Sequence, residues 1–261
     1  MDNSVSFLDT LFDELCIGNL REKERIAKSE KRVLRYQKVV DRRKHKRVEE
    51  HRRRRERKRE AAKNGTQSNK NTMKPISICI DLGFCLEMNP KERGKLIRQL
   101  GRVWGLQKRY MGLSTTLVNC DRALQADGGR IVSGFNSFSW KMTEESLENL
   151  QTLSSIVYLS PDAEMEPLLT VDTASIYVIG GLVDESGKGS MSREKADGLG
   201  VKCHRLPIPE FLKKESSGTF NVMLTINQVV EILCRFAASG DWEESLGPVV
   251  PARTGYVVSK D

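Results

Sequence analysis

The fold is decided by the stretch Ile176-Tyr177-Val178-Ile179-Gly180-Gly181-Leu182-Val183-Asp184. Its apolar first half predicts a buried strand, two glycines end that strand, and a carboxylate follows three residues later. Ligands of open α/β sheets bind beyond the carboxyl ends of the strands, where glycines let the backbone approach closely. The spacing alone leaves two interpretations open, which are a ligand-binding strand end and a plain glycine turn with an exposed aspartate. The stretch is neither a G-x-G-x-x-G fingerprint nor a P-loop.

Other short apolar runs predict further strands near residues 76–81, 115–120, 155–159 and 202–206. Helices are predicted near residues 143–150, 192–199 and 225–238. Another is predicted to begin at Asn89, with Pro90 in its first position and Glu92 in its third. The tail that holds Pro248 and Pro251 is expected to be irregular. Strands that alternate with helices indicate an α/β domain around a mostly parallel sheet.

Positive charge is concentrated in one block of the chain. Residues 21–63 hold 21 Lys/Arg against 8 Asp/Glu, whereas residues 64–261 hold 22 against 23, and the first 20 residues hold four acids and no base. The block favours helix and has no Gly or Pro, and it ends at Asn64-Gly65. Such an uneven distribution suggests a polyanionic partner, either nucleic acid or an acidic membrane surface.

The remaining composition excludes several classes of protein. Six cysteines are scattered without a C-x-x-C pair, which indicates reduced thiols packed as small hydrophobic residues. With three histidines, two of them in the basic block, no metal site is expected. No run approaches 18 apolar residues, so no membrane span is expected. The acidic N-terminus fits neither a secretory nor a mitochondrial signal.

Four segments follow one another in an order that resembles the tRNA purine-nine N1-methyltransferase family, of the SPOUT class. They are Tyr158-Leu159-Ser160-Pro161-Asp162, the stretch from Val178 to Asp184, Arg205-Leu206-Pro207-Ile208, and Leu224-Thr225-Ile226-Asn227-Gln228. Ile78-Cys79-Ile80-Asp81 at the first strand and Asp241-Trp242 after the last predicted helix are also similar to the family. The run Leu182-Val183-Asp184-Glu185-Ser186 is most similar to the animal paralogue lettered B. The resemblance covers residues 75–257, although the connection over residues 210–220 is longer than in close relatives.

The resemblance implies a SPOUT fold, whose C-terminal part forms a trefoil knot, and a pocket for S-adenosyl-L-methionine (SAM) made by three segments. The implied cofactor-binding residues are Leu159, Val178, Gly180, Gly181, Leu182, Val183, Asp184, Glu185, Ser186, Ser190, His204, Leu206, Pro207, Asn221, Val222, Met223, Leu224 and Thr225. Asp184 matches the family's proposed general base. A base is needed for guanine, whose N1 carries a proton, but not for adenine, so Asp184 is compatible with either purine.

The implied function is SAM-dependent methylation of N1 of guanosine or adenosine at position 9 of tRNA, by a monomer. The alternative is a protein that keeps the fold and binds tRNA or a partner without catalysis. A different nucleotide enzyme is disfavoured by the missing phosphate loop. A cysteine nucleophile is disfavoured because Cys203 and His204 are neighbours on one strand and point to opposite faces.

The basic block is interpreted as the part that contacts tRNA phosphates. It lacks both a sustained apolar seam and a membrane-binding apolar face, and a purely solvated helix or a nuclear-localisation signal also fits it. The expected RNA-binding residues are Arg42, Arg43, Lys44, Lys46, Arg47, Arg52, Arg53, Arg54, Arg55, Arg57, Lys58 and Arg59. Placement in the nucleus, the cytoplasm or both is expected.

The expected organisation has five parts. An acidic and apolar segment (1–20) precedes the basic helical extension (21–63), a linker (64–74), the SPOUT methyltransferase domain (75–257) and a short tail (258–261).

Overall fold

A computed structural model describes most of the chain beyond residue 70 and part of the basic block before it. The described residues are 25–46, 48–50, 52, 53, 55, 56, 71–149, 153–164, 166–183, 189–219 and 221–259. The chain divides into two compact units, Met1–Gln67 and Ser68–Asp261.

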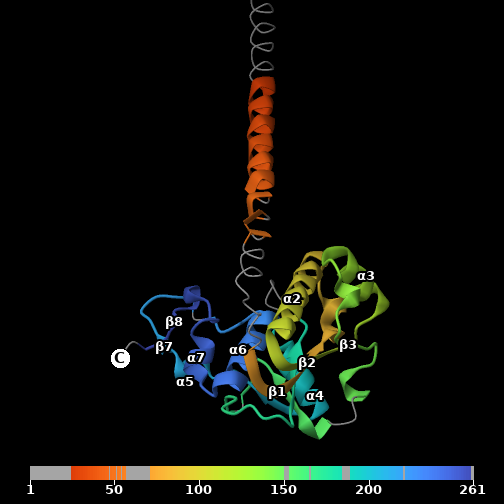
Figure 1. Ribbon diagram of the computed structural model, residues 1–261, viewed down its shortest axis with the longest axis vertical. Helices are drawn as coiled ribbons and strands as arrows, with labels where there is room; N and C mark the ends of the chain where they lie inside the picture. Colours follow the sequence, from red (N-terminus) through yellow and green to blue (C-terminus); the bar gives the residue numbers. More distant parts are fainter. Residues whose placement is uncertain are drawn as a thin grey trace, which may run out of the picture. The chain divides into compact units, whose positions relative to one another are not determined.

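The first unit contains a helix that is described over residues 25–46 and 48–50, with four further helical residues up to 56 (Figure 1). Its side chains are exposed almost throughout, including Ile26 and Val33, which are 52% and 56% exposed. Glu49 accepts hydrogen bonds from Arg52 and Arg53, one turn further along the helix. Ion pairs of this spacing between exposed side chains stabilise a helix only slightly.

The second unit is built on a six-stranded sheet with the order β3-β2-β1-β5-β4-β6, in which every neighbouring pair is parallel (Figure 1). The strands are β1 (Asn71–Asp81), β2 (Tyr110–Val118), β3 (Lys141–Met142), β4 (Ile156–Leu159), β5 (Ile176–Gly180) and β6 (Lys202–His204). The predicted parallel sheet is therefore confirmed. The chain runs outward from β1 through β2 to β3 on one side. It then crosses to β4 on the other side and comes back with β5, which lies between β1 and β4, so the strand order reverses between β1 and β5.

Successive side chains along the central strands point to opposite faces of the sheet, and they pack into two cores, one on each face. On β5, Tyr177 and Ile179 lie in the larger core, whereas Val178 lies in the smaller one. The larger core is covered by α2 (Pro90–Arg109) and α6 (Ile226–Ser239), and the smaller one by α4 (Met191–Leu199). Burial on both faces explains why these strands read as continuous apolar runs.

The predicted start of α2 is confirmed. Asn89 is the N-cap and accepts hydrogen bonds from the backbone of Lys91 and Glu92, while the Glu92 side chain accepts one from the Asn89 backbone. Pro90 occupies the first turn, where its missing N–H costs nothing. Leu96, Ile97, Leu100 and Val103 then pack into the larger core.

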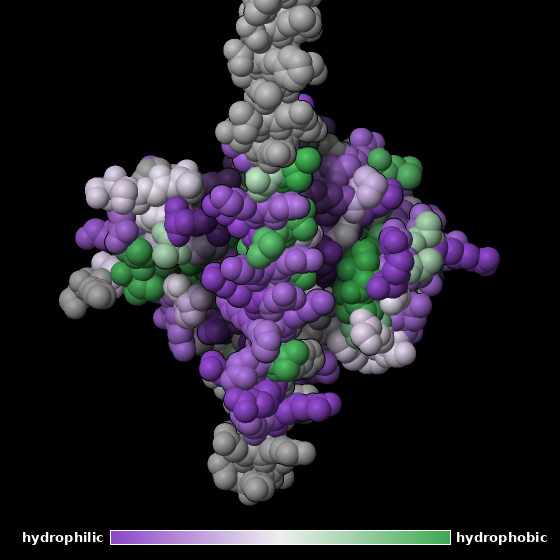
Figure 2. All heavy atoms as spheres, turned by 90° about the horizontal axis from the view of Figure 1, so that it is seen from above, coloured by the Kyte–Doolittle hydropathy of each residue, from purple (hydrophilic) through white to green (hydrophobic). Residues whose placement is uncertain are grey.

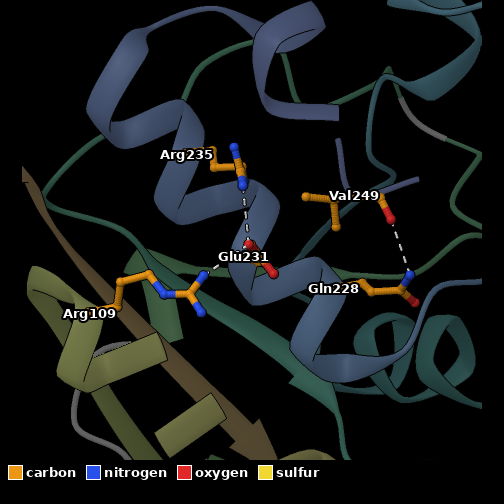
Figure 3. Close-up of polar contacts among 5 residues, drawn as sticks. All are labelled: Arg109, Gln228, Glu231, Arg235 and Val249. Atoms are coloured by element: carbon orange, nitrogen blue, oxygen red, sulfur yellow. Dashed lines mark hydrogen bonds and ion pairs between the residues drawn. The ribbon is translucent and has the colours of Figure 1, made fainter. Parts of the chain in front are cut away.

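Helix α6 is fixed to its surroundings by polar contacts as well as by its apolar stripe (Figure 3). Glu231 lies 3.4 Å from Arg109 at the end of α2 and 3.3 Å from Arg235 on α6 itself. Gln228 donates a hydrogen bond to the carbonyl of Val249. Helix α6 is therefore held to both α2 and the C-terminal tail.

The predicted helix over residues 143–150 is wrong in its extent. The described part holds a single turn of 3₁₀ helix, η3 (Leu147–Asn149). The carbonyls of Thr143 and Glu145 accept hydrogen bonds from Cys120 and Asn119 at the end of β2, so they are not available to a helix.

Several elements were not predicted. They are β3, η1 (Leu82–Glu87), α3 (Arg122–Ile131), η2 (Phe135–Ser137), η4 (Leu153–Ser155), α5 (Ile208–Phe211), β7 (Lys213–Lys214), α7 (Trp242–Leu246), η5 (Ala252–Thr254) and β8 (Tyr256–Val257). The tail is therefore not wholly irregular, because β8 pairs antiparallel with β7.

Hydrophilic residues predominate on the face drawn in Figure 2, where hydrophobic residues form small and separate patches. Among the helices described, none is both long and apolar enough to span a membrane.

Candidate functional site

A cavity of about 340 Å³ lies at the carboxyl ends of β4, β5 and β6. Its wall combines these strand ends with the loop that precedes α6, the start of α4 and one residue of α2. The lining residues are Gln99, Leu159, Ser160, Pro161, Asp162, Ile179, Gly180, Leu182, Val183, Gly189, Ser192, Arg205, Leu206, Ile208, Pro209, Val222, Met223, Leu224, Thr225, Ile226 and Val229. This is the edge of a parallel sheet at which ligands of α/β proteins bind.

Half of the cofactor-binding residues expected from the sequence lie on this wall. They are Leu159, Gly180, Leu182, Val183, Leu206, Val222, Met223, Leu224 and Thr225. They come from four separate stretches of the sequence, at residue 159, residues 180–183, residue 206 and residues 222–225, and folding brings them around one space.

Six other expected residues lie beside the cavity and not on its described wall. Val178 is fully buried in the smaller core, because it occupies the alternate face of β5. Gly181 donates its N–H to the carbonyl of Asp81 at 2.7 Å. Ser190 is the N-cap of α4, and its hydroxyl donates to Glu194.

The other three have local structural contacts. A ring nitrogen of His204, Nδ1, lies 2.7 Å from the carbonyl oxygen of Glu166. Pro207 is the N-cap of the short helix α5. The Asn221 side chain accepts a hydrogen bond from the backbone of Met223 and so shapes the loop that does line the cavity.

The expected general base, Asp184, lies outside the described residues, as do Glu185 and Ser186. Among the expected RNA-binding residues, those outside the described part are Arg47, Arg54, Arg57, Lys58 and Arg59. The remaining ones are exposed on the N-terminal helix, namely Arg42, Arg43, Lys44, Lys46, Arg52, Arg53 and Arg55.

Gly180 and Gly181 are both closely packed. An added Cβ on Gly180 would lie 2.4 Å from the Ser192 hydroxyl oxygen, and one on Gly181 would lie 2.8 Å from the carbonyl oxygen of Asp81. Because the second neighbour is backbone, any side chain at Gly181 would push β1 and the cavity loop apart.

The structure adds Gln99 to the site. This residue of α2 is 8% exposed, lines the cavity, and accepts a hydrogen bond from the backbone N–H of Ile226 at 2.9 Å. The sequence carried a signal for it, since Gln99 is a polar residue on the apolar face of the helix, between Leu96 and Leu100 on one side and Val103 on the other.

Arg205 and Glu210 form a second polar feature of the wall. The guanidinium donates to both carboxylate oxygens, at 2.9 and 2.6 Å. These hydrogen bonds from Arg205 lower the pKa of the Glu210 carboxyl below its usual value. A two-pronged pair of this kind fixes the direction of both side chains and so shapes the rim of the cavity.

Asp81, at the end of β1, is the most enclosed carboxylate near the cavity. Its side chain has no exposed surface and contacts four groups: Lys195 Nζ at 2.6 Å, Asn119 Nδ2 at 2.8 Å, the Gly83 N–H at 3.0 Å and the Tyr158 hydroxyl at 3.1 Å. Burial and the neighbouring Asp81 raise the pKa of Tyr158 far above its usual range, so this hydroxyl stays protonated and donates.

The described cysteines near the sheet have the properties of packed thiols. Burial raises the pKa of Cys79 and Cys120 to about 12, and that of Cys203 to about 11. A thiol with so high a pKa is a poor nucleophile at neutral pH. Cys203 packs in the smaller core while its neighbour His204 contacts the Glu166 backbone, so the pair is not arranged for catalysis.

Fold and site together define an α/β protein with a parallel sheet and a mostly apolar ligand cavity, into which a few polar groups converge. The family model described as "tRNA (guanine(9)-N(1))-methyltransferase TRM10/TRM10A" matches residues 19–255. The chain therefore belongs to this family, as its sequence motifs predicted.

Individual relatives agree with this assignment. "tRNA methyltransferase 10 homolog B" of Rattus norvegicus is 32% identical over 243 residues, which are 85% of this chain and 77% of the relative. The protein of the same name from Bos taurus is 37% identical over 186 residues, 69% of this chain and 58% of the relative. A crystal structure of full-length spTrm10 in complex with SAH superposes with a TM-score of 0.60 at 30% identity, covering 70% of this chain and 97% of that one.

Proposed function

We propose that this protein transfers a methyl group from SAM to N1 of guanine at position 9 of tRNA. The observation that carries the proposal is the meeting of four separate stretches of the sequence on one cavity at the carboxyl edge of the sheet. Support comes from the family to which the chain belongs and from the SAH complex of a family member with a similar fold.

The described residues of the cavity suit SAM. Leu206, Val222 and Leu224 offer apolar surface for an adenine ring, while the backbone at Gly180 and Leu182 offers hydrogen-bonding groups close to it. The Asp162 carboxylate and the Gln99 amide offer polar partners for the ribose hydroxyls and the amino-acid part. A cavity with so few charges suits a ligand that is recognised mainly by shape and by backbone groups.

When bound, SAM supplies a methyl group made electrophilic by the attached sulfonium. Guanine N1 can accept this methyl group only once its own proton is removed, because removal of the proton frees the electron pair that forms the new bond. The chain contributes by holding the two reactants in line at short distance, which lowers the barrier without any covalent step of its own. The proton that guanine N1 carries goes to a carboxylate, for which we propose Asp184.

The finer architecture belongs to the same proposal. The cavity is closed by residues 222–225, which follow the longer connection after α5, and we propose that this C-terminal part is threaded as a trefoil knot. The basic helix, with the domain boundaries expected above, is proposed to bind tRNA phosphates, and the protein to act as a monomer in the nucleus, the cytoplasm or both.

The test is transfer of labelled methyl from SAM to unmodified tRNA transcripts that carry either G or A at position 9. We expect label at G9, and a loss of at least about a hundredfold in rate for Asp184→Asn, the scale of a missing general base. Asp127→Asn on the surface of α3 serves as the matched control and should keep the wild-type rate. Binding of SAM without transfer to either transcript would instead support a non-catalytic tRNA-binding protein.

A further inference from the structure

Asp81 does not line the described wall of the cavity, but its backbone and its side chain both contact segments that belong to the wall or lie next to it. Its backbone carbonyl accepts the N–H of Gly181, at the start of the wall segment Gly180–Val183. Its carboxylate pairs with Lys195 on α4, and the first residues of α4 belong to the wall segment Gly189–Ser192. One residue at the end of β1 thus contacts the chain both after β5, at Gly181, and on α4, at Lys195.

Lys195 is tightly enclosed in this arrangement. Its ammonium lies 2.6 Å from Asp81 Oδ2 and 5.0 Å from the ring centroid of Phe84, and its side chain is 23% exposed. An added Cβ on Gly83 would come within 2.8 Å of the ammonium, so the adjacent glycine leaves room for it. The lysine is one helical turn beyond Ser192, which itself lines the cavity and contacts Gly180.

Stability alone is a weak reason for this pair. Removing two charges from water costs about as much as their attraction returns, so buried ion pairs often contribute little net stability. They do restrict geometry strongly, because a displaced partner leaves an uncompensated charge. The Asp81 carboxylate also accepts hydrogen bonds from Asn119, Gly83 and Tyr158, which fixes the point to which Lys195 is tied.

We infer that Lys195 is a positioning residue which, through Asp81, sets the distance between the two wall segments Gly180–Val183 and Gly189–Ser192. The pair fixes α4 to the end of β1, while the Gly181–Asp81 hydrogen bond fixes the other segment to the same residue. The expected effect of Lys195 on SAM binding rests on the proposed function. The expected effect of Lys195 on the positions of the two segments does not.

The experiment compares the full-length wild type with Lys195→Met and with the double variant Asp81→Asn/Lys195→Met. SAM affinity is measured by titration calorimetry and the melting temperature by calorimetric unfolding. The rates of amide hydrogen exchange are measured over residues 181–183 and 189–192. We expect Lys195→Met to weaken SAM binding about tenfold to a hundredfold, the scale of an ångström-sized misplacement, and to speed exchange in both segments.

The double variant separates positioning from stability. Because it removes both charges, it should recover much of the melting temperature, while SAM binding stays weak and exchange stays fast because the tie is missing. Arg193→Met is the matched control, since it removes a surface ion pair of the same helix with Glu164 and should leave the affinity within about twofold.

Wild-type affinity and exchange in Lys195→Met would overturn the inference, and so would recovery of both in the double variant. If the wild type binds SAM but methylates no tRNA, the proposed function fails while the affinity data still decide the role of Lys195. If the wild type binds no SAM, the exchange rates decide it alone.

Discussion

At the scale of single residues, the shift in the pKa of an ionisable side chain depends on the groups that contact it more than on its residue type. Glu210 is partly exposed, yet its pKa is lowered first by the hydrogen bonds from Arg205, with burial acting in the opposite direction. A lowered pKa in the folded state means that ionised Glu210 stabilises the fold above its ordinary pKa of 4.5, and that this contribution is lost as the pH falls through the folded value.

We therefore predict that Glu210→Gln destabilises the protein at pH 7 and that the difference from wild type shrinks as the pH falls below 4.5. The effect at pH 7 should stay below about 1 kcal/mol, because solvent screens a pair of which each side chain is about a third exposed. Urea midpoints of both proteins across this pH range measure it. The exposed Glu148→Gln serves as control, and an equal pH dependence in both variants would contradict the prediction.

Residue chemistry explains which parts of the site could be predicted from the sequence. Gly180 and Gly181 stand out because glycines after an apolar run permit close backbone approach, and the structure places Ser192 and the Asp81 carbonyl where a Cβ would be. Val178 and His204 show the limit of this reasoning. A motif gives neighbours in sequence, but strand alternation turns Val178 into the smaller core, and a contact with the Glu166 carbonyl holds the His204 ring.

At the scale of elements, the sequence predicted best those helices whose backbone hydrogen bonds are made with neighbouring residues. In the capping box of α2, the Asn89 side chain accepts from the backbone N–H groups of the first turn, and the Glu92 side chain accepts from the backbone N–H of Asn89. No distant residue is needed. The segment 143–149 behaves differently, since its carbonyls accept from residues 119 and 120 across the fold. Its helix-like composition could not show that competing partner.

The cap of α2 gives a prediction at this scale. Asn89→Ala should lower the free energy of unfolding by about 1 kcal/mol, because two backbone donors of the first turn lose their acceptor. Asn89→Ser keeps a capping oxygen and should stay close to wild type. Urea unfolding of the three proteins measures the difference, and equal losses for alanine and serine would exclude capping as the cause.

At the scale of the whole molecule, each of the two units has its own part in the proposed function. The helical unit presents cations along an exposed helix, with Arg42, Arg43 and Lys44 among the described ones, whereas the second unit holds the cavity. Release of counterions from RNA makes such binding strongly dependent on salt.

We predict that tRNA binding by the full chain weakens steeply with salt, and that replacing Arg42, Arg43 and Lys44 by Gln makes the slope of log K against log salt shallower by about 2. This value follows from about 0.7 per lost phosphate contact with a single strand. Swapping the same positions to Lys, Lys and Arg keeps the charge and should keep the slope. Filter binding at several salt concentrations measures both, and an unchanged slope in the Gln variant would show that these cations do not meet phosphates.

The sequence by itself determined the alternation of strands and helices, the concentration of charge in one block, and the family motifs around Gly180, Leu206 and Thr225. These features depend on local periodicity, composition and order along the chain. The tertiary structure decided which side chains share a space. Gln99 from α2 joins the cavity, Val178 leaves it, and Asp81 meets Lys195. Such contacts join residues up to 127 positions apart, as for Gln99 and Ile226, and packing of the sheet against its helices fixes them.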